Sequence, residues 1–177
     1  MTTTTTNQKS ETGTIAAHAL QTAQGQIGQQ EVPKGSNAGP MVDKYLQSVG
    51  LRPGFAWCQA FVYWCFEQAA AQLGKANPVV KTGGVYNCWN KTPDVHKVLK
   101  SNVMQHPELV EPGMQFVLLF GRGVGHTGIV ESVDAVAQTF ATIEGNSNTN
   151  GGREGYEVVR HVRHMNEPAL QGFIKYV

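Results

Sequence analysis

The sequence lacks a surplus of charge and a long apolar run. Its 14 Lys and Arg side chains are matched by 13 Asp and Glu side chains, a formal net charge of +1, which leaves no electrostatic footprint for nucleic acid. A helix that spans a bilayer needs about 20 apolar residues, whereas the longest apolar candidate, Phe55 to Phe66, contains Gln59 and is followed by Glu67. We therefore expect neither a nucleic-acid partner nor membrane insertion.

An apolar segment is also missing at the N-terminus, where Met1 precedes a polar, Thr-rich stretch. A cleavable secretory signal requires an apolar core, so we expect a protein made in the cytoplasm without such a signal. Residues 1–12 have no periodicity and too little apolar surface to offset the entropy of ordering, which predicts a disordered polar tail. Residues 13–177 have the length of a single domain, and we expect a monomer.

Cysteine is scarce, and its spacing excludes common metal and redox sites. Cys58, Cys65 and Cys88 include no C-x-x-C pair, which excludes zinc-ribbon and thioredoxin-type sites. Because the number is odd, at least one thiol is unpaired within the chain, and a disulfide between Cys65 and Cys88 stays open. His161 and His164 are three residues apart in an expected strand and point to opposite faces, so they are poor joint ligands. No metal and no cofactor are expected.

The first half of the chain has helical periodicity. Apolar residues spaced by four from Ile15 to Ile27 predict a first helix, which Gly25 and Gly28 weaken. The same spacing predicts a short helix over 41–49 and a central helix over 56–73 that is apolar on nearly every face. Such a helix belongs at the centre of a fold. Residues 77–92 are expected to be irregular, and a short helix is expected over 93–100, starting at a proline.

In the second half the period changes to that of strands. Segments rich in β-branched and aromatic residues, separated by Gly, Asn or Asp clusters, predict strands at 114–120, 126–133, 136–144, 156–164 and 172–177. Helices followed by strands indicate an α+β fold. We expect the central helix to pack on an antiparallel sheet of about five strands.

Cys58 is a candidate nucleophile because of its place in the central helix, two residues after the expected start. Unpaired backbone N–H groups and the helix dipole favour an anion there, and the thiolate is the reactive form of cysteine. The alternative is a small buried packing residue, the usual role of a free cysteine. Cys65 lies two turns further along nearly the same face and is expected in the core.

His126 and Glu144 are candidates for the base and its orienting group. Glycines flank His126 at the start of an expected strand and allow close approach of a substrate or another backbone. Counted from a tight turn at Asp134-Ala135, the two residues lie eight and nine positions out on neighbouring strands, so they face each other. A carboxylate there can fix the imidazole tautomer, and Asn146 could do the same or donate to a substrate.

Four segments, taken in order, resemble the CHAP family of cysteine, histidine-dependent amidohydrolases/peptidases, within the NlpC and papain-like group. They are P-G-F-A-W-C-Q-A-F-V at 53–62, E-P-G-M-Q-F at 111–116, G-H-T-G-I-V at 125–130 and E-G-N at 144–146. The resemblance implies a papain-like fold and residue roles: Cys58 as nucleophile, His126 as general base, Glu144 as orienting carboxylate and Asn146 as the polar residue beside it.

The same resemblance implies a peptidoglycan hydrolase that cleaves an amide bond through a thioester. The bond is either the N-acetylmuramoyl-L-alanine amide or a bond within the stem or cross-bridge peptide, and the stem peptide is the expected partner. The oxyanion would be bound by the Cys58 backbone N–H and a second donor, for which Gln59 is a candidate. Some family members carry a calcium loop of closely spaced aspartates before the cysteine, whereas residues 33–53 offer only Asp43.

Five residues are candidates for contact with substrate: Trp57, Gln59, Tyr86, Trp89 and Gly125. Core packing is the alternative for Trp57. Two other functions stay open, a papain-like protease or deamidase acting on a protein, and a non-catalytic wall-binding module. Without a signal peptide, export, injection or phage lysis would bring the protein to the periplasm or cell wall, with a delivery system or a cognate immunity protein as further partners.

Overall fold

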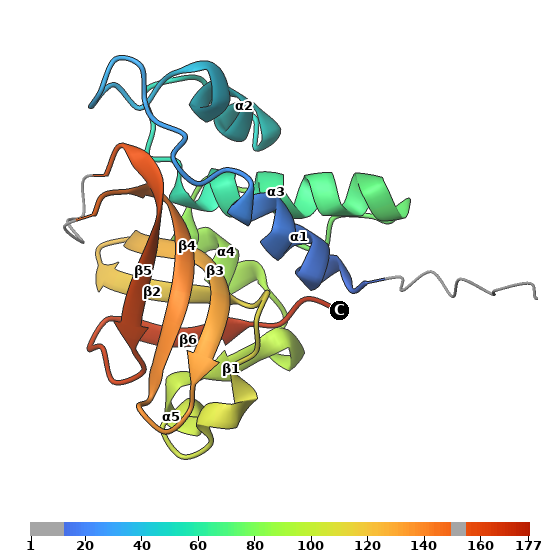
Figure 1. The fold of residues 1–177 in the computed structure, drawn as a ribbon, viewed down its shortest axis with the longest axis vertical. Helices are drawn as coiled ribbons and strands as arrows, with labels where there is room; N and C mark the ends of the chain where they lie inside the picture. The colour runs from blue at the N-terminus through green and yellow to red at the C-terminus, as the bar shows by residue number, and fades with distance from the viewer. Residues whose placement is uncertain (1–12, 150–154) are drawn as a thin grey trace, which may run out of the picture.

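The computed structural model describes residues 13–149 and 155–177. The expected polar tail at residues 1–12 lies outside the described residues. Figure 1 shows the arrangement: α1, α2 and α3 gather at one end of a twisted antiparallel sheet, and α4 crosses the face of the sheet behind it. Among the described residues, no helix is both long and apolar enough to cross a bilayer.

Three helices form the N-terminal layer. The Thr14 side chain caps α1 (Ile15–Gln24) by accepting from the Ala17 N–H. The helix α2 (Pro40–Ser48) begins at a proline, and no hydrogen bond is lost there because the first N–H of a helix has no partner within the helix. The central helix α3 (Cys58–Leu73) ends at Gly74, which adopts the left-handed conformation with φ of 62°. These helices confirm the predicted order, although α3 begins at Cys58 itself.

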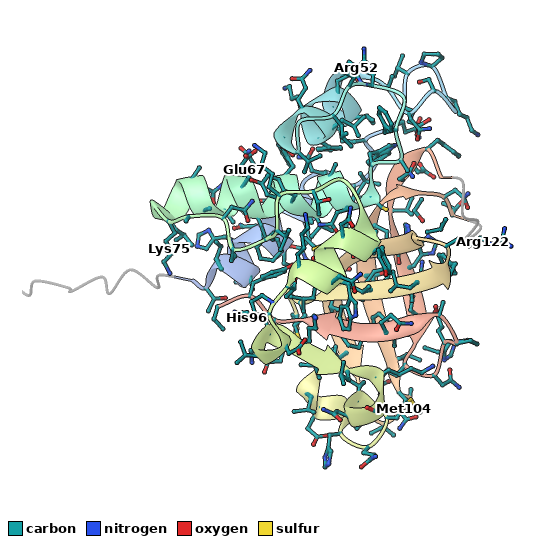
Figure 2. The ribbon with its side chains drawn as sticks, turned by 180° about the vertical axis from the view of Figure 1, so that it is seen from behind. Arg52, Glu67, Lys75, His96, Met104 and Arg122 are labelled. Atoms are coloured by element: carbon teal, nitrogen blue, oxygen red, sulfur yellow. The ribbon has the colours of Figure 1, made fainter. Side chains whose placement is uncertain are left out.

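The sheet has six strands in the order β1-β6-β2-β3-β4-β5, and every neighbouring pair is antiparallel. The strands are β1 (Lys97–Leu99), β2 (Gln115–Gly121), β3 (Val124–Asp134), β4 (Thr139–Ser147), β5 (Glu157–His164) and β6 (Leu170–Ile174). This confirms the α+β class and corrects the strand number. Figure 2 shows Arg122 projecting from the turn between β2 and β3.

Two predictions between the central helix and the sheet are wrong. Residues 77–92 were expected to be irregular, yet α4 (Val85–Lys91) forms there because Val85 and Cys88, one turn apart, are both buried. A helix was expected from Pro93 to about Lys100, yet only one 3₁₀ turn (Asp94–His96) forms before the chain pairs with β6 as β1. The short helix α5 (Lys100–Val103) and a 3₁₀ turn (Pro107–Leu109) follow.

Side chains from the two faces of the sheet enter two separate cores. Val117, Ile129 and Ile174 pack with the helices, whereas their chain neighbours in β2, β3 and β6 point to the opposite face and join a second cluster. That second cluster also contains Phe140 of β4. Each face of the sheet is therefore covered by its own hydrophobic cluster. The start of α3 lies at the edge of the sheet, where these two faces meet.

Candidate active site

Cys58 is the first residue of α3 and its side chain is 5% exposed. The preceding residue, Trp57, makes no side-chain cap hydrogen bond, so no side-chain acceptor from the N-cap competes for the first N–H groups of the helix. Figure 1 shows this end of α3 beside β4, which α3 contacts. The structure therefore places the thiol at the rim of the sheet, at the positive end of a helix of 16 residues.

His126 and Glu144 are in direct contact, as predicted. His126 Nε2 and Glu144 Oε2 lie 2.7 Å apart, and the histidine side chain is 12% exposed while the carboxylate is fully buried. Because the ionised carboxylate accepts, the proton lies on Nε2, which leaves Nδ1 available to the thiol of Cys58, whose interaction with the ring contributes to the raised pKa of His126. His126 is thus held by Glu144 on one side and lines the same pocket as Cys58.

The turn and the strand register from which the sequence predicted this contact are wrong. The turn between β3 and β4 is longer than the predicted Asp134-Ala135, because Asp134 pairs with Thr139, and the register shifts between Val130 and Ser132. Ile129 is therefore opposite Ile143, which places Glu144 diagonally from His126. A diagonal neighbour on one face of a sheet is within reach of long side chains.

Arg163, which the sequence did not indicate, holds the other side of the carboxylate. Its Nε and Nη2 lie 2.5 and 2.7 Å from Glu144 Oε1 and Oε2, the bidentate geometry that favours an arginine over a lysine. Arg163 pairs with Phe140 across β4 and β5, so its side chain runs along the same face as Glu144. The Thr142 hydroxyl also donates to Glu144 Oε1, at 2.6 Å.

These contacts shift two pKa values in opposite directions. Burial by itself would lower the pKa of His126. Hydrogen bonding and charge interactions with Cys58 and Glu144 outweigh the effect of burial and raise this pKa to about 9. Burial would raise the pKa of Glu144, but hydrogen bonds from His126 and Arg163 hold it well below its usual range. The site therefore favours an imidazolium beside a carboxylate that stays ionised.

Two glycines make room for this arrangement. A Cβ at Gly128 would lie 2.5 Å from the Ile143 carbonyl oxygen and 2.9 Å from Glu144 Cγ, so only glycine lets β4 and the carboxylate approach. A Cβ at Gly145 would lie 2.7 Å from Phe61 Cγ and 2.8 Å from Trp57 Cζ3. Close approach of α3 to β4 therefore depends on Gly145.

Gln59 and Trp57 do not face a substrate with their side chains. Both are fully buried. Gln59 Oε1 accepts from Gln115 Nε2 at 2.8 Å, and the same nitrogen donates to Thr127 Oγ1 at 2.8 Å. The prediction that these side chains line the groove is therefore wrong. Instead, Gln59 ties the first turn of α3 to β2 and β3, while Trp57 packs against Tyr45.

A pocket of about 330 Å³ opens beside Cys58. Gly125, His126 and Asn146 line it together with the cysteine, which supports the prediction that Gly125 lies at the substrate groove. Its remaining lining includes four residues that precede α3 or β5: Glu31, Lys34, Asn37 and Tyr156. The sequence did not indicate these residues, because no local pattern connects residues 31–37 with the strands.

Tyr86 and Trp89 lie on α4, outside the residues that line this pocket. Tyr86 is 47% exposed. Trp89 packs partly against the core, and Lys97 Nζ lies 5.2 Å from the centroid of its ring. A contact with a long substrate beyond the pocket stays a prediction for both.

Cys65 and Cys88 are buried free thiols, so the disulfide left open by the sequence does not form in this structure. Cys65 lies in the core, as expected, and burial raises the pKa of its thiol well above the usual value. Cys88 lies in α4 and not in a loop. Within residues 13–149 and 155–177, no three His, Cys, Asp or Glu side chains gather as metal ligands.

Comparison with known proteins gives a family and a fold. The family model described as the CHAP domain matches residues 50–146, a range that contains Cys58, His126, Glu144 and Asn146. The crystal structure of the endolysin LysIME-EF1 superposes with a TM-score of 0.56 at 14% identity over 90% of this chain and 63% of that one. The structure of Ly7917 gives a TM-score of 0.53 at 18% identity, with 92% and 62% coverage. The chain thus spans less than two thirds of either protein. No curated protein matches the sequence.

Proposed function

The chain belongs to the CHAP domain family, and from this premise we propose that it is a peptidoglycan hydrolase that cleaves an amide bond with Cys58 as nucleophile. The observation that carries the proposal is that Cys58 and His126 line one pocket while Glu144 holds the far side of the imidazole ring. A nucleophile, a base and an orienting carboxylate in contact are what covalent acyl transfer requires.

In the first half of the reaction the Cys58 thiolate attacks the carbonyl carbon of the scissile amide. The new S–C bond forms as the C=O electron pair moves to oxygen, and the Cys58 backbone N–H, at the positive end of α3, faces the developing oxyanion. The imidazolium of His126 then gives its Nδ1 proton to the amide nitrogen. The C–N bond breaks, the amine leaves and a thioester remains.

In the second half, neutral His126 takes a proton from water, and the resulting hydroxide oxygen attacks the thioester carbonyl. The C–S bond breaks, the carboxylic acid leaves, and the thiolate and imidazolium are restored. Glu144 accepts from Nε2 throughout, which keeps the ring oriented and stabilises its positive charge. Asn146, in the pocket wall, is positioned to contact the substrate.

The proposed substrate is the peptide part of the bacterial cell wall. One relative in fold is described as an endolysin, which supports peptidoglycan as the substrate. The pocket of about 330 Å³ beside Cys58 accommodates a few amino-acid side chains of a peptide. Both the N-acetylmuramoyl-L-alanine amide and a stem or cross-bridge peptide bond fit this chemistry. A delivery system or an immunity protein would be a further partner.

The test is hydrolysis of purified peptidoglycan by the wild-type protein, Cys58→Ala and Cys65→Ala, with released fragments identified by mass spectrometry. Loss of the nucleophile should lower the rate by about 10³-fold or more, whereas Cys65→Ala, which removes another buried thiol of the same helix, should retain most activity. The masses of the fragments identify the bond.

Equal release by the wild type and Cys58→Ala would refute the mechanism. Cleavage of casein without release from cell wall would instead indicate a protease. If Cys58 in the native protein reacts with iodoacetamide no faster than in the denatured protein, and no substrate is cleaved, the chain is a non-catalytic module.

A further inference from the structure

Glu31 is a buried acidic residue in the wall of the pocket, outside the residues matched by the family model. Its side chain is 4% exposed. Oε1 accepts from the indole Nε1 of Trp57 at 2.9 Å, and its backbone N–H donates to the Tyr156 carbonyl at 2.8 Å. Glu31 is thus held from two sides, beside the residue that precedes Cys58.

The second carboxylate oxygen has no such partner. Among the described residues, Glu31 Oε2 and Asn146 Oδ1 are buried acceptors without a hydrogen bond. Both residues line the pocket that contains Cys58 and His126. A buried acceptor without a donor destabilises the folded protein, and an unpaired carboxylate oxygen destabilises it more than an unpaired amide oxygen does. Two such acceptors in one pocket indicate a ligand that brings donors.

The other charged groups in the pocket wall do not fill this role. Lys34 is the only lysine or arginine among the described lining residues, and its Nζ lies 3.8 Å from the ring centroid of Tyr156. The His126 ring is used by Cys58 and Glu144. None of the described lining side chains thus donates to Glu31 Oε2, and a positively charged donor on a bound molecule would complement the carboxylate.

We propose that Glu31 determines specificity by binding a primary ammonium group of the substrate peptide, with Asn146 Oδ1 as a second acceptor. This inference rests on the proposed function, since it assumes that a peptide occupies the pocket beside Cys58. The substrate class is then a peptide with a free amino group near the scissile amide. A purely structural role, in which Glu31 only orients Trp57, would require no such group.

The test uses pairs of synthetic stem peptides that are identical except that one amino group is free or acetylated. A charged hydrogen bond contributes about 1.5–3 kcal/mol, a factor of about 10 to 150, so the wild type should cleave the free-amine peptide with a kcat/KM higher by about that factor. In Glu31→Gln the amide oxygen can still accept from Trp57, but the charge is lost, and the ratio between the two peptides should fall to near one. Glu111→Gln, the same change in an exposed ion pair with Lys175, should keep the wild-type ratio.

Equal cleavage of the paired peptides by the wild type, at every amino position tested, would overturn the inference, as would a Glu31→Gln variant that keeps the preference. If Glu31→Gln does not fold, Glu31→Asp retracts the carboxylate without removing its charge and should reduce the ratio. If the wild type cleaves neither peptides nor peptidoglycan, the proposed function fails. Calorimetric binding of the same pairs to Cys58→Ala then still decides the inference, because preference for the free amine supports it and equal binding refutes it.

Discussion

At the scale of single residues, the buried charge of Glu144 explains why Arg163 matters. A carboxylate with no exposure is unfavourable unless it is paired and hydrogen-bonded. Arg163 supplies two hydrogen bonds and a full charge, and its guanidinium carbon also lies 5.1 Å from the centroid of Phe116. Arg163 therefore acts through Glu144, and we regard it as a positioning residue.

Replacement of Arg163 by methionine should destabilise the fold by about 3–5 kcal/mol, because it leaves a buried carboxylate with one charged partner fewer. The pKa of Glu144 should rise, and kcat should fall more than KM changes. Urea denaturation and steady-state kinetics measure these effects. Arg160→Met is the matched control, since Arg160 lies on the same strand but pairs with Glu131 at the surface, with a side chain that is 55% exposed. Equal destabilisation by the two changes would contradict the argument.

The raised pKa of His126 predicts an alkaline limit to activity. In the proposed mechanism the imidazolium protonates the leaving amine, so kcat/KM should fall as the pH rises through about 9, where the histidine loses its proton. A histidine whose folded pKa lies above its ordinary value of 6.5 contributes stability below pH 6.5 that is lost as the pH rises through about 9.

A pH profile of kcat/KM checks the position of this limit. NMR titration of Cys58→Ala provides the control, because loss of the thiol partner should lower the pKa of His126. An alkaline limb near 6.5, or an unchanged pKa in the variant, would mean that Cys58 does not stabilise the imidazolium.

At the scale of elements, the contact between the start of α3 and the end of β4 brings Cys58 close to His126 and Glu144. Gly145 lies between Glu144 and Asn146, and on the opposite face of the strand it meets Phe61 and Trp57 of the helix layer. The two residues of the site on β4 therefore share their strand with the residue that sets the distance to α3.

Gly145→Ala should push β4 away from α3, because the new Cβ would lie under 3 Å from two aromatic rings. We expect destabilisation of about 1–3 kcal/mol and a loss of about 10- to 100-fold in kcat, since displacement of a catalytic group by about 1 Å has effects of this size. Thermal denaturation and peptidoglycan turnover measure the two effects.

Gly25→Ala is the control for this change. Gly25 ends α1 with φ of −68°, and its Cβ would meet no atom closer than 3.4 Å. Stability and turnover close to wild type are expected for it. If Gly145→Ala is equally mild, the spacing between α3 and β4 is not what aligns the site.

The short elements show where pattern reading fails. β1 has only three residues and its pairing partner is β6, whose residues are more than 70 positions later in the chain. The segment from Pro93 has the start signal of a helix, but the available strand edge of β6 ends it after one turn. For an element this short, the local preference is smaller than the gain from pairing with the sheet.

At the scale of the whole molecule, the pocket is assembled from four parts of the chain. The segment before α2, the start of α3, the start of β3 and the segment around β4 and β5 each contribute to its wall. An isolated bridge between Gln30 and Glu157 and a hydrogen bond from Glu31 to Tyr156 connect the first of these to the last. A substrate would thus be held between the helical layer and the rim of the sheet.

The sequence by itself determined the class of fold, the central helix with Cys58 near its start, and that His126 and Glu144 are neighbours on adjacent strands, whereas the bulge that sets their register came from the structure. Helical and strand periods and turn residues act over a few positions, so a single chain displays them directly. Only the tertiary structure decided that Arg163 holds Glu144, that Gln59 and Trp57 turn inward, and that Glu31 enters the pocket. Trp57 and Glu31 are 26 positions apart, and Arg163 and Glu144 are 19 apart. Such contacts depend on bulges, strand register and the packing of α3 on the sheet, which local patterns do not encode.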